Sequence, residues 1–183
     1  MDVLAVTVAA GFLLVFAEQI VSGLMRRRQT RAYIRRWVRW AEQTVEEIET
    51  DYGKASTSWS AFRESATDER PSKLPQIAMI QAALPPVAGL LVEMNIHVPP
   101  DVIEHLSRAD ACLSRASEDG SNIIGFTHTL HLNAETADAR ETRAYAAIML
   151  THYRLARAYA AQAGEALEKA RKHRMFGRCL CWV

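Results

Sequence analysis

The stretch VFAEQIVSGLMRRRQTRAYIRRWVRW, residues 15–40, joins the end of an apolar run to a strongly basic segment. The run from Val3 to Met25 is 23 residues long and carries one ionisable side chain, that of Glu18. A helix of about 20 predominantly apolar residues is long enough to cross a hydrocarbon core of about 30 Å. We therefore predict a single transmembrane helix within residues 1–25.

The basic segment predicts the orientation of that helix. Positive charge is concentrated after the apolar run rather than before it, which is unlike a cleaved secretory signal. Basic residues next to a span stay on the cytoplasmic side. We expect the plasma (bacterial inner) membrane, with the N-terminus outside and the C-terminal part in the cytoplasm. The alternative is a long buried helix at the centre of a soluble oligomer.

The basic segment is also expected to touch the membrane surface. Its arginines and tryptophans suit anionic headgroups, each basic side chain near the surface contributing about 1 kcal/mol. The whole chain has a net charge of +1, so we expect no nucleic-acid partner. The residues predicted to form this membrane interface are Arg26, Arg27, Arg28, Arg31, Arg35, Arg36, Trp37 and Trp40.

Two polar residues, Glu18 and Gln19, lie inside the predicted span. A carboxylate at that depth must find a partner, reach toward the interface or stay protonated. We expect it to reach toward the headgroups. The alternatives are helix–helix association and an ion path.

Beyond the span, we predict an all-α protein in which the first helix continues into a cytoplasmic antiparallel helical bundle. Residues 26–52 form a basic juxtamembrane region and an amphipathic helix, and residues 53–75 a polar linker. The bundle itself occupies residues 76–183. The apolar stripe of the amphipathic helix recurs at three- and four-residue steps, at Ile34, Trp37, Val38, Ala41, Val45, Ile48 and Tyr52.

Within the bundle, prolines separate predicted helices over 75–84, 86–95 and 100–117, and Asp119-Gly120 is expected to end the last of them. A long helix over 134–175 follows, capped by Asn133. Its small residues predict close contact between helices. The predicted inner face of this helix consists of Ala137, Glu141, Ala144, Ile148, His152, Leu155, Tyr159, Ala163, Ala166 and Ala170.

One group of side chains resembles a metal site in composition. His128, His131 and Glu135 are residue types that bind zinc or iron, and His152 follows further along the chain. The residue between them, Asn133, argues against one continuous helix through all of them. We therefore prefer a structural role for these histidines, with a metal site as the alternative.

These patterns favour a non-enzymatic protein without a cofactor. The chain contains no phosphate-binding glycine motif and no serine-hydrolase or His-Glu-x-x-His motif. Its odd number of cysteines, three, favours a reducing compartment for the part outside the bilayer. We predict a scaffold, tether or regulator that binds a protein partner or itself. The alternatives are a membrane-attached metal-dependent enzyme and a self-assembling, membrane-perturbing effector that uses Glu18 and Gln19.

Overall fold

The described part of the chain is built from long helices. A computed structural model describes residues 3–65, 74–78, 87, 98–132 and 138–173, without the side chains of residues 3–16, 27 and 65. Every regular element in these ranges is helical, and no strand occurs among them. The all-α prediction is therefore confirmed for the described part of the chain.

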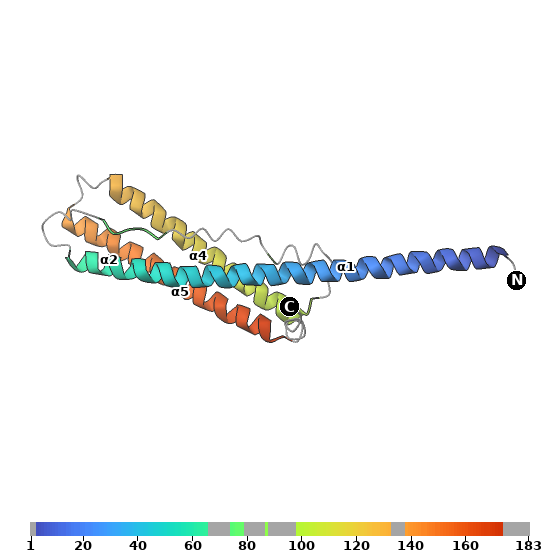
Figure 1. The fold of residues 1–183 in the computed structure, drawn as a ribbon. Helices are drawn as coiled ribbons and strands as arrows, with labels where there is room; N and C mark the ends of the chain where they lie inside the picture. Colours follow the sequence, from blue (N-terminus) through green and yellow to red (C-terminus); the bar gives the residue numbers. More distant parts are fainter. Residues whose placement is uncertain (1–2, 66–73, 79–86, 88–97, 133–137, 174–183) are drawn as a thin grey trace.

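The first half of the chain forms one long rod. Helix α1 spans Val3–Glu47, a single π-helical segment, η1, covers Ile48–Tyr52, and α2 continues over Gly53–Ser65 (Figure 1). Gly53 keeps right-handed helical angles, and its N–H donates to the carbonyl oxygens of Glu49 and Thr50, so the rod does not break there.

Helix α2 corrects the predicted linker over 53–75. The segment is polar in composition, yet Ala55, Trp59 and Phe62 repeat at helical spacing and all three are buried. The rings of Trp59 and Phe62 meet edge to face, with centroids 5.4 Å apart. Two aromatic side chains on one face are enough to hold an otherwise polar helix against the bundle. Residues 74–78 have no regular structure, and the rest of the predicted linker lies outside the described residues.

Helix α4 spans Pro100–Leu132 and is much longer than the predicted 100–117. Asp119 and Gly120 do not end it, because both are buried within the helix and apolar positions recur beyond them at Ile123 and Leu130. Packing on both sides of a glycine outweighs the roughly 1 kcal/mol that glycine costs inside a helix. Of the helices predicted over 75–84 and 86–95, residues 75–78 are irregular, and nearly all the remainder lies outside the described residues.

Helix α5 spans Ala139–Lys172. Its N-cap is Asp138, whose carboxylate accepts the backbone N–H of Glu141 at 2.7 Å, a standard way to satisfy a free donor at a helix start. The long C-terminal helix predicted over 134–175 is present with these narrower bounds. The predicted cap, Asn133, lies outside the described residues.

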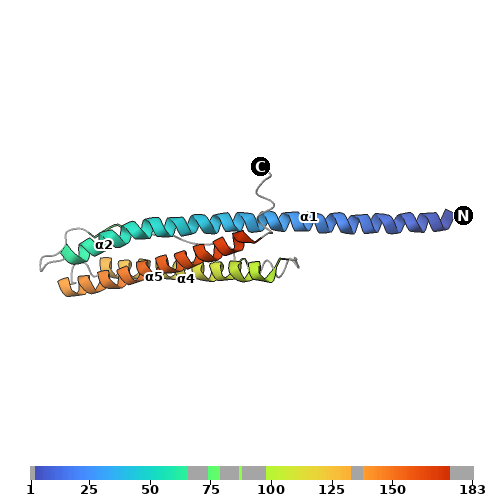
Figure 2. The same cartoon turned by 90° about the horizontal axis from the view of Figure 1, so that it is seen from below.

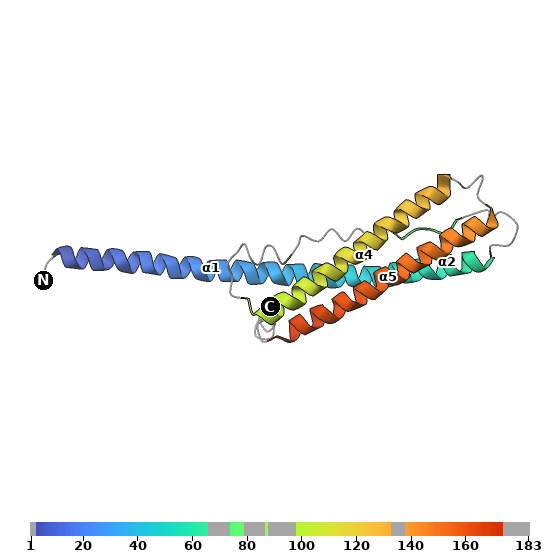
Figure 3. The ribbon, with the colours of Figure 1, turned by 180° about the vertical axis from the view of Figure 1, so that it is seen from behind.

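The helices form a three-helix bundle with one projecting arm. Helices α1 and α4 run in the same direction and α5 runs antiparallel to both (Figures 1 and 3). In Figure 2 the rod of α1 and α2 lies along one side of the α4–α5 pair, and the N-terminal half of α1 extends past the end of that pair. At one end of the described fold the helices pack together, and at the other end α1 projects by itself.

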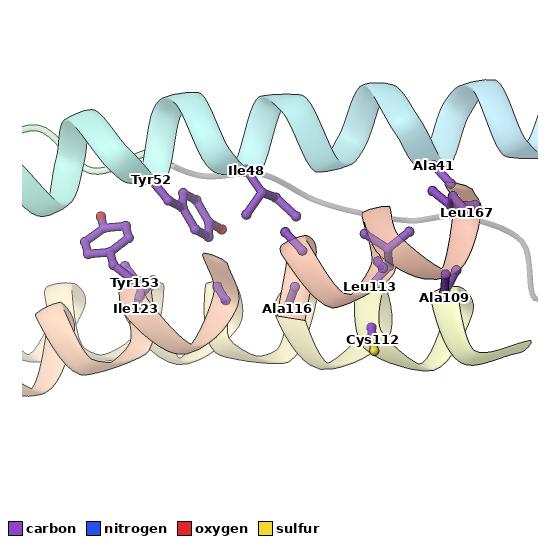
Figure 4. Close-up of a cluster of buried hydrophobic side chains, with 14 of the residues drawn as sticks. Ala41, Ile48, Tyr52, Ala109, Cys112, Leu113, Ala116, Ile123, Tyr153 and Leu167 are labelled. Carbon is purple, nitrogen blue, oxygen red and sulfur yellow. The ribbon is translucent and has the colours of Figure 1, made fainter. Parts of the chain in front are cut away.

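The core lies where the second half of α1, η1 and α2 meet α4 and α5. Figure 4 shows part of it, with Ile48 and Tyr52 pointing from the rod into the bundle and Tyr52 next to Tyr153 of α5. The rings of Tyr52 and Tyr153 meet edge to face at 5.2 Å. Small residues on α5 allow close approach: Gly164 lies where an added Cβ would contact Val45 at 3.6 Å. The predicted stripe of the amphipathic helix is buried, apart from Val45, which is partly buried.

The buried face of α5 is rotated from the predicted one over its first half. Ile148 and Leu155, predicted to face inward, are 38% and 41% exposed. Both stripes of α5 have apolar spacing near 3.6 residues, so periodicity alone could not choose between them. The residues that α5 buries are Thr142, Ala146, Met149, Leu150, Tyr153, Ala156, Ala160, Ala163, Ala166, Leu167 and Ala170.

Candidate functional site

The projecting arm of α1 exposes large apolar side chains. Ile20, Val21, Leu24 and Met25 are 50–59% exposed, and they lie on one broad side of the helix. An added Cβ at Gly23 would meet nothing within 4 Å, so this turn has no packing partner among the described residues. Exposed apolar side chains grouped in this way mark an interaction site more often than chance.

The arginines that follow are exposed as well. Arg26, Arg28, Arg31, Arg35 and Arg36 all lie at the surface of α1, and the side chain of Arg27 is outside the described set. The Arg35 Nε donates to the carbonyl oxygen of Arg31 at 3.2 Å, one turn back. No carboxylate among the described residues forms an ion pair with these five guanidinium groups. Their charge is therefore available to an anionic partner.

The two tryptophans predicted at the membrane interface have different environments. Trp40 is 43% exposed on the same rod. Trp37, in contrast, is fully buried in the bundle core. The prediction that Trp37 lies at the membrane interface is therefore wrong. Trp37 shares a helix face with Ile34 and Ala41, and that face packs onto the other helices.

The predicted span receives no support from the structure. In the part of the chain that the structure describes, no helix is long and apolar enough to cross a membrane. Glu18 and Gln19, the polar residues predicted inside the span, are exposed on the projecting arm. The transmembrane helix stays a prediction of the sequence.

The histidines of the alternative metal site do not converge within the described residues. His128 and His131 are exposed on α4, Glu135 lies outside the described ranges, and His152 sits on α5 with another partner. Across the described ranges, no three His, Cys, Asp or Glu side chains are placed to hold a metal ion together.

The partner of His152 is Asp119 of α4. The His152 Nδ1 lies 2.8 Å from the Asp119 carboxylate oxygen, and both side chains are largely buried. The ring of Phe126 stacks on His152 at 5.5 Å. The pair joins α4 to α5, which gives His152 a structural role. Sequence reasoning missed it because the two residues are 33 positions apart and no local spacing connects them.

Two partly buried groups, the Asp110 carboxyl and the Tyr33 hydroxyl, have shifted pKa values. Burial raises the pKa of the Asp110 carboxyl above its ordinary value, opposed by a hydrogen bond from the backbone at Val87. Burial also raises the pKa of Tyr33, helped by the nearby charge of Asp110. Asp110 of α4 and Tyr33 of α1 are therefore close neighbours across the contact between these two helices.

A shallow groove near the C-terminal end of α5 is lined by charged side chains that form ion pairs with one another. Arg171 donates to Glu42 at 3.1 Å, and Lys172 meets Glu168 at 2.7 Å. The hydrogen bond to Lys172 lowers the pKa of the Glu168 carboxyl. With its charges satisfied by near neighbours, this groove offers no evident catalytic group.

Comparisons with protein-family models, with curated proteins and with solved structures found no match for the chain. Function must therefore be argued from the surfaces just described. The most distinctive of them is the projecting arm, where exposed apolar side chains adjoin exposed arginines.

Proposed function

We propose that this chain is a single-pass, membrane-anchored helical protein that works as a non-enzymatic scaffold, tether or regulator. The proposal has the first part of α1 in the plasma (bacterial inner) membrane, the N-terminus outside and the bundle in the cytoplasm. The bundle then binds a protein partner or a second copy. The single observation that carries the proposal is the arm of α1, which exposes apolar side chains immediately before a cluster of exposed arginines.

The apolar part supports insertion on energetic grounds. Moving one large aliphatic side chain out of water contributes roughly 1.5–3 kcal/mol. Ile20, Val21, Leu24 and Met25 remain about half exposed, so the bundle has not used this contribution. The sequence before them is apolar as far as Val3, and a lipid environment would accept the whole run.

The basic part supports the orientation. Positively charged residues that flank a span stay in the cytoplasm, and anionic headgroups attract them. The five exposed arginines without an acidic partner in the described set are therefore placed to fix the inner boundary of the span. Trp40, also exposed, lies further along the same helix.

The test is alkaline carbonate extraction of the tagged full-length protein from membranes. Wild type should remain in the membrane pellet. A Leu13→Glu/Ile20→Glu variant should be released, since each acidic group near the middle of a span costs about 2.5–3.5 kcal/mol. The matched control is Ile124→Glu/Leu132→Glu, which places the same change at exposed positions of α4 and should stay in the pellet.

Release of the wild-type protein by carbonate without detergent would overturn the proposal. Orientation is read from the same preparation, with protease added to spheroplasts. A tag at the C-terminus should be protected. Cleavage of that tag in intact spheroplasts would show that the arginines do not set the topology as proposed.

A further inference from the structure

Helix α5 carries two apolar stripes, and the bundle uses one of them. The unused stripe, here called the outer α5 stripe, runs along exposed positions at alternating four- and three-residue steps and contains no charged side chain. It includes the two large apolar residues of α5 that remain exposed, Ile148 and Leu155. The outer α5 stripe consists of Ala144, Ile148, Thr151, Leu155, Ala158 and Gln162.

Among the described residues, the recorded contact between this stripe and another helix is at its last member, where the Cys112 thiol of α4 donates to the Gln162 side-chain oxygen at 4.0 Å. The rod packs on another side of α5, where Arg171 meets Glu42 and Tyr153 meets Tyr52. Next to the stripe, α5 contacts α4 through the Asp119–His152 pair. A helix that packs in a three-helix bundle needs one apolar stripe. A second, uncharged stripe that is left exposed indicates another helix.

We propose that the outer α5 stripe pairs with the same stripe of a second copy of this chain, in parallel and in register. The inference names the partner within the proposed function, and it rests on that proposal for the direction of pairing. Because each α1 is antiparallel to its own α5, parallel α5 helices send both α1 arms the same way, toward one membrane (Figure 1). Antiparallel pairing would send them in opposite directions.

The spacing suits a two-stranded coiled coil. Steps of four and three residues place Ile148, Leu155 and Gln162 at the a positions of a heptad, and Ala144, Thr151 and Ala158 at the d positions. Aliphatic residues at two a positions, Ile148 and Leu155, alternate with small alanine and threonine residues at the d positions, which allows close contact. Gln162 occupies the last a position of the seam, where its side-chain oxygen already accepts from the Cys112 thiol of α4 at 4.0 Å.

The flanking positions are complementary in a parallel pair. In such a pair each g residue faces the e residue five positions further along the other chain. Arg154 then faces Tyr159 of the second copy, and Arg140 faces its Tyr145. Arginine over a tyrosine ring is a favourable contact, already seen inside one chain where Arg115 lies 5.7 Å from the Tyr159 ring. No like-charged side chains face each other across the four g-to-e pairs from residue 140 to residue 166.

The seam is short and has few large side chains, so we expect weak pairing in dilute solution. Confinement of both copies to one membrane raises their effective concentration and strengthens pairing without any new contact. The expected state is a dimer that forms at the membrane and dissociates on dilution in detergent.

Disulfide cross-linking of the full-length protein in its native membranes tests the proposal. The background replaces the native cysteines, as Cys112→Ser, Cys179→Ser and Cys181→Ser. On it, Ala158→Cys should give a cross-linked dimer under mild oxidation, since parallel pairing in register brings each d position next to its own copy. The matched control is Ser114→Cys, an exposed position on α4 that should give none.

A second variant separates the interface from the anchor. Leu155→Glu added to Ala158→Cys should abolish the cross-link while the protein stays in the carbonate pellet. Absence of the Ala158→Cys cross-link, or an equal cross-link from Ser114→Cys, would overturn the pairing whatever the pellet contains. Release of the protein by carbonate would overturn the anchor alone, and the cross-link read in the soluble fraction would still decide whether the copies pair.

Discussion

The two halves of α1 belong to one continuous helix but have opposite surroundings. Before Thr30 the apolar side chains with described positions, such as Ile20 and Leu24, are about half exposed. From Thr30 onward the helix buries Ile34, Trp37 and further residues of the same face. Nothing in the backbone marks the change, since α1 runs unbroken from Val3 to Glu47.

This contrast shows that helix formation and burial have separate causes. The backbone hydrogen bonds of a helix are local and need no partner. Burial depends on whether other elements reach that turn. Arg171 of α5 meets Glu42, and Asp110 of α4 lies close enough to Tyr33 to raise its pKa, whereas an added Cβ at Gly23 would meet nothing within 4 Å. The described apolar side chains of the first half, such as Ile20, therefore belong to a regular helix but remain about half exposed.

The largest expected effect comes from truncating the same residue type in each half. Ile34→Ala should lower the free energy of unfolding by about 2–5 kcal/mol, because it leaves a cavity in the core. Ile20→Ala should change it by less than about 0.5 kcal/mol, because that side chain is 50% exposed on the projecting arm. Urea unfolding in detergent, followed by tryptophan fluorescence, measures both. Equal losses for the two variants would contradict the contrast.

An intermediate effect is expected within the bundled part of the rod, at the Tyr52–Tyr153 contact. Burial raises the pKa of Tyr153 from 10.0 to about 12, opposed by a backbone hydrogen bond from Ala78 and assisted by Tyr52. The folded state therefore keeps a proton that the unfolded state loses above pH 10. Stability should be unaffected by this group below pH 10 and should fall by about 2–3 kcal/mol between pH 10 and 12.

The measurement is the free energy of unfolding across that pH range, for wild type and Tyr153→Phe. The variant lacks the ionising hydroxyl and should show a shallower alkaline loss. If the two slopes are the same, the pKa of Tyr153 is not the cause. The projecting half of α1 should contribute nothing to either slope.

The smallest expected effect concerns the exposed edge of the bundled half. Glu42→Gln removes the ion pair with Arg171, whose side chains are 37% and 52% exposed. Ion pairs of this kind contribute about 0.2–1 kcal/mol and are screened by salt. Glu46→Gln, an exposed change on the same helix, is the matched control and should be near neutral. A loss that persists in 1 M salt would point to packing rather than charge.

Sequence reasoning succeeded where one pattern had no competitor. The stripe from Ile34 to Tyr52 was predicted and is in the core, because no other face of that segment is apolar. It was wrong at three places where two readings competed. The segment after Gly53 is helical, Gly120 does not end α4, and α5 buries a different face over its first half.

Each of those three errors has a tertiary cause. Buried Trp59 and Phe62 hold α2 on the bundle. Gly120 is itself buried, between buried apolar residues that precede and follow it in α4. Helix α5 buries Leu150 and Tyr153 in place of Ile148 and Leu155. Of the predicted site, the exposed arginines could be found from sequence because charge is a local property. The burial of Trp37 could not be predicted from sequence, and neither could the Asp119–His152 pair, because both depend on which helix faces pack together.

The amino-acid sequence by itself determined that this chain is helical, where α1 and α5 lie, and how apolar and basic side chains follow each other along the first helix. These properties depend on backbone propensity, on composition and on neighbours within one or two turns. Only the tertiary structure decided which of the two stripes of α5 is buried, which half of α1 is left alone and which residues pair across helices. The physical reason is that burial and pairing belong to contacts between distant segments, and several arrangements of the same local pattern compete until the whole core is packed.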